Sequence, residues 1–345
     1  MNGFWKMKKC LVTGGMGFGG SHLCEQLLAQ GAMVYVIDRV YPKNSYLILA
    51  ELIDNVEFIQ GDICDLELLK FILYRYEIDV VFHLAAQPIV PMSIALPYET
   101  LCTNAAGTFA VLEAVRTSAF QPSLVFASSG AYYGTIRQSD PIDEEQAANA
   151  AANIYGPSKI AGDFAVRSYV KTYGIKAAVC RFINTYGPGS TNFSTIVPAA
   201  ISKLIENQPY DFGDRDDGTS SFDYLHVRDM SRGYIDVAEN MNACCGEAFN
   251  FSGGTTITVR NLVQMISVLF DGQEREPMFY GPKQEVPVCK ALDYSKAKKI
   301  LGWAPSTVLR DGLTETIEWY ERFWPAITKK GQHETYHPAN TFAKI

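Results

Sequence analysis

The amino-acid sequence predicts an α/β protein built on a doubly wound parallel sheet, with a smaller C-terminal lobe interleaved with it. In the first half of the 345-residue chain, short apolar runs alternate with segments of helical periodicity. One run, residues 79–86, is apolar enough for a strand buried on both faces, as in a parallel sheet. Beyond residue 189 the alternation ends, and short helices mix with loops rich in Gly, Pro and Asp. Ligands of such a sheet bind at the carboxyl ends of its strands.

The first strand, the turn after it and the first helix form a glycine-rich unit. Residues 10–12 are apolar, and Gly14, Gly17 and Gly20 follow at three-residue spacing. Leucines then recur at helical spacing up to Gly31. The glycines permit a tight turn and let a pyrophosphate approach the free N–H groups of the helix N-terminus. The unit therefore predicts a Rossmann-type dinucleotide site.

Two acidic residues at strand ends extend this site. Residues 33–37 predict a second strand that ends at Asp38, which is placed to accept hydrogen bonds from an adenosine ribose. Its carboxylate would repel a 2′-phosphate, so we expect NAD rather than NADP. The third strand, residues 56–60, leads into Asp62 and Ile63. These two residues either lie beside the adenine or belong to an acidic helix cap.

The remaining elements support a division into two lobes. We expect further strands at residues 124–127 and 175–182, and helices at residues 47–53, 66–76, 98–118, 153–173, 194–206 and 259–269. We expect the dinucleotide-binding domain to comprise residues 1–187 together with residues 223–252, which return to it. Residues 188–222 and 253–325 should form the substrate lobe, and residues 326–345 should form a polar tail.

Composition limits the possible partners. The net charge of −7 and the pI near 5.4 provide no basic surface for nucleic acid or anionic lipid. No apolar run approaches the ~18 residues of a membrane span, and the N-terminus lacks a signal-peptide pattern, so we expect a cytoplasmic protein. The eight cysteines are scattered without metal-ligand spacing, which predicts reduced thiols and no metal site.

A tyrosine and a lysine in the middle of the chain are the candidate catalytic pair. Tyr155 and Lys159 stand four residues apart, so both side chains leave one face of the expected helix. A nearby ammonium favours a phenolate, which can then transfer protons. Ser129 follows a predicted strand in the same lobe. The same spacing recurs at Tyr294 and Lys298, where no such serine is nearby, and we interpret that segment as a surface helix.

These motifs together resemble one enzyme family. The glycine segment 13–20, Ser129, and Tyr155 with Lys159 are similar to the extended short-chain dehydrogenase/reductase family, in its nucleotide-sugar epimerase and dehydratase branch. The resemblance spans residues 8–324. It implies bound NAD, with Ser129 and Tyr155 on the 4-hydroxyl of a nucleotide-diphosphate sugar and Lys159 on the nicotinamide ribose. It also implies a homodimer formed through helices 98–118 and 153–173.

The expected site residues fall into three groups. The catalytic residues are Ser129, Tyr155 and Lys159; the cofactor-binding residues are these last two with Gly14, Gly17, Phe18, Gly20, Asp38, Asp62, Ile63, Leu84, Ala85, Ala86 and Asn104; the substrate-binding residues are Gln87, Ser129, Asn184, Asn192, Phe212, Arg215 and Lys290.

The residues after Ser129 bear on the reaction. Dehydratases of this family carry an Asp and a Glu, or a variant polar pair, directly after the Ser or Thr, whereas this chain has Gly130 and Ala131. This loop resembles that of 4-epimerases. Segments 83–90 and 192–198 instead look like CDP-glucose 4,6-dehydratases. Tyr132, Tyr133 or Cys180 would then have to supply the missing proton relay.

The substrate side departs from the family pattern. Phe222 stands where the resemblance places an arginine that binds the diphosphate, and 281–290 also lacks the usual arginine. Arg215, Lys283 or Lys290 could replace it, or the substrate is unusual. Asn184 matches a residue that contacts phosphate, and Phe212 a residue that stacks on the base or is an ordinary core aromatic.

The leading hypothesis is an NAD-dependent nucleotide-sugar 4-epimerase. The alternatives are a 4,6-dehydratase with an atypical acid and base, a 4-keto sugar reductase, and a catalytically silent dinucleotide sensor.

Overall fold

A computed structural model describes residues 3–135, 140–149, 153–214 and 216–329. Its centre is a seven-stranded sheet in the order β10-β6-β5-β4-β1-β2-β3, and every neighbouring pair is parallel. The strands are β1 (Lys9–Thr13), β2 (Met33–Asp38), β3 (Val56–Gln60), β4 (Val80–His83), β5 (Ser123–Ala127), β6 (Ala177–Phe182) and β10 (Ala248–Phe251). The doubly wound parallel sheet expected from the sequence is confirmed.

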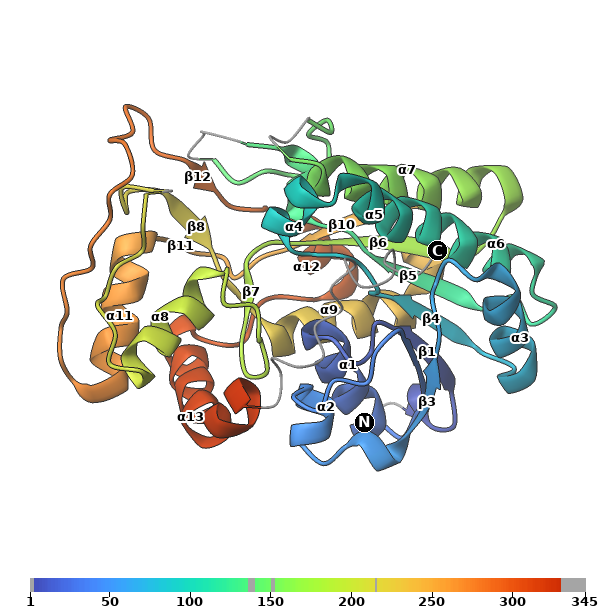
Figure 1. The fold of residues 1–345 in the computed structure, drawn as a ribbon. Helices are drawn as coiled ribbons and strands as arrows, with labels where there is room; N and C mark the ends of the chain where they lie inside the picture. The colour runs from blue at the N-terminus through green and yellow to red at the C-terminus, as the bar shows by residue number, and fades with distance from the viewer. Residues whose placement is uncertain (1–2, 136–139, 150–152, 215, 330–345) are drawn as a thin grey trace, which may run out of the picture.

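Helices cover both faces of this sheet (Figure 1). One face packs against α1 (Phe18–Ala29), α9 (Val227–Glu239) and α12 (Ser295–Leu301), with Leu23 and Trp303 among the fully buried residues. The other face packs against α3 (Leu66–Tyr76), α6 (Gly107–Thr117) and α7 (Tyr155–Tyr173). Burial on both faces explains why the inner strands β1, β4 and β5 consist mostly of apolar residues.

The helix expected at residues 98–118 is divided into three parts. It consists of α5 (Pro97–Leu101), a π-helical turn (Cys102–Ala106) and α6. Single π-helical turns inside α-helices are frequent at functional sites. Here the turn holds Asn104, which is buried.

The second lobe has its own small sheet and helices. Strands β11 (Thr256–Thr258), β8 (Ser221–Asp223) and β12 (Cys289–Lys290) pair in that order. Helices α8 (Ile196–Ile205), α11 (Val259–Asp271) and α13 (Leu309–Lys329) enclose a separate apolar core. They lie together on the left of Figure 1.

The chain crosses between the lobes several times. The segment 223–252 contributes strand β10 to the large sheet and helix α9 to one of its faces. Ala297 of α12 and Trp303 also pack into the core of the first lobe, although we assigned them to the substrate lobe. Helix α13 runs to Lys329 and so includes the first four residues of the expected tail 326–345; residues 330–345 lie outside the described part.

Short elements complete the described chain. They are the 3₁₀ helices Gly3–Trp5, Ile53–Asn55 and Gly130–Tyr133, the helices α2 (Tyr46–Leu49), α4 (Val90–Ala95) and α10 (Met241–Cys244), and the paired strands β7 (Thr185–Tyr186) and β9 (Leu225–His226). Within the described ranges, the helices are all too short or too polar to span a bilayer.

Candidate functional site

One large cavity lies at the carboxyl ends of the strands. It has a volume of about 930 Å³ and is lined by residues that follow β1, β2, β4, β5 and β6, together with residues of the second lobe. This size is at the upper end of ordinary ligand pockets. Most of the expected site residues line it: Gly14, Gly17, Phe18, Gly20, Asp38, Ile63, Leu84, Ala85, Ala86, Ser129, Tyr155, Lys159, Asn184, Asn192 and Lys290.

The glycine turn after β1 is packed so closely that side chains would not fit. Gly14 has a φ of 71°, and a Cβ there would lie 2.8 Å from the backbone nitrogen of Ala85. A Cβ on Gly20 would overlap the carbonyl oxygen of Gly14 and lie 2.8 Å from Gly15 Cα. The turn and the start of α1 therefore present backbone to the cavity, and this cradle fits the pyrophosphate of a dinucleotide.

The two acidic residues expected near the adenosine differ in position. Asp38 lines the cavity, and its carboxylate accepts N–H groups from Met16 at 3.2 Å and Arg39 at 2.8 Å. Burial raises the pKa of Asp38, and these backbone bonds oppose the rise. Asp62 is outside the lining; it accepts the Cys64 N–H at 2.9 Å, as the turn before α3 requires, while Ile63 lines the cavity.

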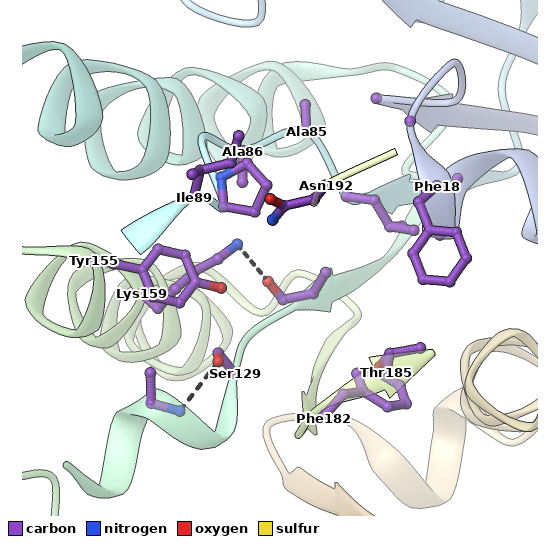
Figure 2. A pocket seen from close by; sticks show the side chains of 18 of the residues that line it. Phe18, Ala85, Ala86, Ile89, Ser129, Tyr155, Lys159, Phe182, Thr185 and Asn192 are labelled. Atoms are coloured by element: carbon purple, nitrogen blue, oxygen red, sulfur yellow. Dashed lines mark hydrogen bonds between the residues drawn. The ribbon is translucent and has the colours of Figure 1, made fainter. Parts of the chain in front are cut away.

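The candidate catalytic side chains converge from two elements. Tyr155 and Lys159 project from the first turns of α7, and Ser129 follows β5. In the view of Figure 2 the Tyr155 hydroxyl lies between the Lys159 ammonium and the Ser129 hydroxyl. Burial raises the pKa of Tyr155, and a hydrogen bond from Ser129 acts in the opposite direction. The Ser129 oxygen itself accepts the Ala131 N–H at 3.1 Å, which caps the 3₁₀ helix Gly130–Tyr133.

Lys159 is enclosed beneath the tyrosine. Its side chain is 4% exposed, and Nζ donates to the carbonyl oxygen of Ala127 at 2.8 Å. Burial lowers the pKa of Lys159 to about 8. Its ammonium is thus held at one place beside Tyr155, as the four-residue spacing predicts. Tyr294 and Lys298 lie outside the cavity, where Tyr294 packs on Trp303.

A buried ion pair, which the sequence did not reveal, supports this strand end. Arg181 of β6 donates to both carboxylate oxygens of Asp163 on α7, at 2.9 and 3.0 Å. Asp163 also accepts the Ser128 hydroxyl at 2.9 Å. Arg181 donates to the Tyr133 hydroxyl at 2.8 Å and stacks on the ring of Tyr132. The sequence contains no local signal for this pairing, because its members come from different elements.

Three expected residues occupy supporting or remote positions. Asn104 accepts the Gln87 N–H at 2.7 Å and donates to the hydroxyl of Ser158 at 2.9 Å, so it ties the loop after β4 to α7. The Gln87 side chain bonds to Ile89 and Thr100. Neither lines the cavity. Phe212 also lies elsewhere and stacks on Phe279 in the second lobe, and Arg215 lies outside the described residues.

The residues suggested as a replacement acid or base are also outside the cavity. Tyr132 and Tyr133 are buried in the network around Arg181, and burial raises the pKa of Tyr133 to about 12. Cys180 is fully buried within β6, which raises its thiol pKa well above the ordinary value. Among the described lining residues, Asp38 is the one carboxylate, and none is a histidine or cysteine.

Residues from both lobes form the opposite wall. Asn184 has a φ of 40° and donates to the carbonyl oxygen of Asp223 at 3.1 Å. Phe222 and Lys290 are paired in the register of β8 and β12, and both line the cavity. Met230 and Tyr234 of α9 also line it. We expected segment 223–252 to return to the first lobe, but we did not predict that these two side chains line the cavity.

Comparisons with known proteins agree over almost the whole chain. The family model described as GDP-mannose 4,6 dehydratase matches residues 11–316. A dTDP-glucose 4,6-dehydratase of Neisseria meningitidis serogroup B is 32% identical over 338 residues, covering 91% of this chain and 93% of that protein. A UDP-glucose 4-epimerase of Mycolicibacterium smegmatis is 30% identical over 318 residues, covering 90% of this chain and 98% of that protein.

A solved structure is also similar. The dTDP-glucose 4,6-dehydratase from Bacillus anthracis, in complex with NAD, has a TM-score of 0.81 and 26% identity, with coverage of 93% of this chain and 99% of that chain. The similar proteins thus divide between two reactions.

Proposed function

Because the chain belongs to the nucleotide-sugar epimerase/dehydratase branch of the extended short-chain dehydrogenase/reductase family, we propose that it is an NAD-dependent nucleotide-sugar 4-epimerase. The substrate is a nucleotide-diphosphate sugar. The reaction proceeds through a transient 4-keto sugar that is reduced again on its other face.

The residues of the cavity can perform the proton transfers of this reaction. The Ser129 hydroxyl donates its hydrogen bond to the Tyr155 oxygen and can accept one from the 4-hydroxyl, which orients both groups. Tyr155 removes the hydroxyl proton and later returns it. Lys159, held by Ala127, keeps a positive charge beside the phenolate. When bound, NAD would accept the hydride from carbon 4, return it, and add a positive charge that favours phenolate.

One observation favours epimerisation over dehydration. Elimination of water across carbons 5 and 6 requires an acid and a base near Ser129. A Cβ on Gly130 would lie 3.3 Å from Ile183 Cβ, so there is little room for a longer side chain. Ala131 lines the cavity without a polar group, and Asp38, the carboxylate among the described lining residues, belongs to the adenosine end.

Mass spectrometry of the products tests the proposal. The purified protein is incubated in heavy water with UDP-, dTDP-, CDP- and GDP-glucose, and separately with added NAD. We expect a product of unchanged mass and new retention time, and a Tyr155→Phe variant that loses at least about a hundredfold of the rate. A product that has lost water and gained deuterium would contradict epimerisation and identify a dehydratase.

We also propose a homodimer formed through α5, α6 and α7. Tyr98, Phe109 and Phe164 of these helices are exposed aromatic residues. The cytoplasmic location stays a prediction from the sequence.

A further inference from the structure

Lys290 is a cation on the substrate side of the cavity. It ends β12, beside Phe222 of β8, and both residues line the cavity. Its Nζ donates to the carbonyl oxygen of Gly134 at 2.7 Å. Gly134 directly follows the 3₁₀ helix that Ser129 caps. Lys290 therefore joins the second lobe to the end of the catalytic loop.

The charge of Lys290 has no carboxylate beside it in the described chain. None of the ion pairs there includes Lys290. An ammonium has three donors, and the neutral Gly134 carbonyl takes one of them. Burial lowers the pKa of Lys290 to about 8. An anion in the cavity would supply the missing countercharge and the missing acceptors.

The other two basic residues that line the described cavity have different surroundings. Arg39 lies at the adenosine end, where its Nη1 is 3.8 Å from an Asp62 carboxylate oxygen. Lys159 lies beneath Tyr155. In the described lining, the substrate half thus contains one basic side chain, that of Lys290.

The position of Lys290 relative to the reacting centre limits what it can reach. Gly134 is five positions after Ser129 along a segment of roughly 3₁₀ geometry, which corresponds to about 10 Å. A sugar whose carbon 4 lies at Ser129 and Tyr155 can bring either a substituent of its ring or its linked diphosphate to this part of the wall.

We propose that Lys290 binds an anionic group of the substrate, either the diphosphate or a carboxylate on the sugar. This inference rests on the proposed function, because it assumes a nucleotide-diphosphate sugar in the cavity. The proposed anion site lies in the substrate half of the cavity. Lys290 of β12 forms it, next to Phe222 of β8.

Binding experiments on two matched variants test the inference. Lys290→Met removes the charge at similar length, and Lys290→Arg keeps it. The NAD-loaded proteins are titrated calorimetrically with UDP, dTDP, CDP and GDP, and then, for the base that binds most tightly, with its nucleotide-glucose and nucleotide-glucuronate. We expect Lys290→Met to weaken binding about tenfold or more, as for a charge-assisted hydrogen bond, and Lys290→Arg to restore most of it.

The ligands distinguish the two sources of negative charge. Weaker binding of the nucleoside diphosphate itself assigns Lys290 to the diphosphate. Weaker binding confined to the nucleotide-glucuronate assigns it to a sugar carboxylate. Unchanged binding of all these ligands by Lys290→Met would overturn the inference, as would a wild-type protein that binds none of the four nucleoside diphosphates.

Two controls separate this result from other failures. Thermal unfolding and NAD content of Lys290→Met show whether the variant folds, and recovery in Lys290→Arg shows that charge, not shape, is responsible. Nucleotide binding without turnover in the wild type would contradict the epimerase but not the role of Lys290. Epimerisation with unaltered binding by Lys290→Met would contradict only the role of Lys290.

Discussion

The proposed role of Lys159 conflicts with the stability of the folded protein. It is 4% exposed, and its ammonium contacts the Ala127 carbonyl and lies 5.3 Å from the centre of the Phe126 ring. Burial lowers its pKa to about 8, below the 10.5 of an exposed lysine. The folded protein thus holds a proton less tightly here than the unfolded chain does. The proposed reaction needs this charge beside Tyr155, whereas its burial opposes folding.

We expect Lys159→Met to stabilise the cofactor-free protein in a pH-dependent way. Below pH 8 both states hold the proton, so the wild type bears the whole penalty, about 3 kcal/mol before the lost hydrogen bond to Ala127 is subtracted. Between pH 8 and 10.5 the wild type regains this stability. Urea unfolding at pH 7 and pH 10 measures the difference. Lys171→Met, at an exposed lysine of α7, serves as control, and an equal effect of Lys159→Met at both pH values would contradict the argument.

The pairing of Tyr155 with Lys159 could be predicted because it depends on local spacing within one helix. The surroundings of Ser129 could not. Asp163 and Arg181 meet from α7 and β6, and their contact follows from the packing of the sheet rather than from any nearby pattern. Phe212 was ambiguous for the same reason, since only tertiary structure places it against Phe279.

At the scale of elements, the N-terminus of α1 depends on a close contact with the turn before it. A Cβ on Gly20 would overlap the Gly14 carbonyl oxygen and lie 2.9 Å from its carbon. These are backbone atoms, which cannot move aside as a flexible side chain can. The position of the helix N-terminus, and therefore of its free N–H groups, is fixed by the absence of a side chain.

We expect Gly20→Ala to displace α1 and weaken NAD binding. The strain should lower the free energy of unfolding by about 1–3 kcal/mol, the range for overpacked sites. Calorimetric titration with NAD and urea unfolding measure the two effects. Gly3→Ala, which adds the same methyl group in open space, should change neither. NAD affinity equal to wild type in Gly20→Ala would show that the contact is not required.

Elements whose pattern lies within their own segment were predicted better than strands formed by the pairing of distant segments. Residues 56–60 and 66–76 match β3 and α3 because their periodicity lies within the segment itself. Strands β8 and β12 have three and two residues, and they exist only because distant segments pair. Helix α13 was not predicted, although its buried residues Leu313, Ile317 and Tyr320 recur at the spacing of one helical face.

At the scale of the whole molecule, the proposed subunit interface contains exposed aromatic residues. Tyr98, Phe109 and Phe164 are 74, 45 and 47% exposed on α5, α6 and α7. Because α7 also carries Tyr155 and Lys159, contacts on its outer face would stabilise the helix that holds the candidate catalytic pair.

We expect Phe109→Glu combined with Phe164→Glu to convert a dimer into monomers. Light scattering after size-exclusion chromatography measures the mass, and circular dichroism shows whether the variant is folded. Phe71→Glu, at an exposed phenylalanine of α3, should leave the dimer intact. A monomeric wild type, or a double variant that remains dimeric, would contradict the proposed interface.

The interleaved chain has a consequence for synthesis on the ribosome. In the sequence, helix α9 and the edge strand β10 come after helix α8 and strand β8 of the substrate lobe. Lys290 comes later still. A nascent chain that ends near residue 220 therefore exposes one edge of its large sheet and lacks the Met230 and Tyr234 wall of the cavity. The cofactor site is complete only after α9 has emerged from the exit tunnel, and the substrate site only after β12 has. Met230 and Tyr234 thus leave the ribosome before Lys290, and α12 and Trp303, which complete the core of the first lobe, leave it after Lys290.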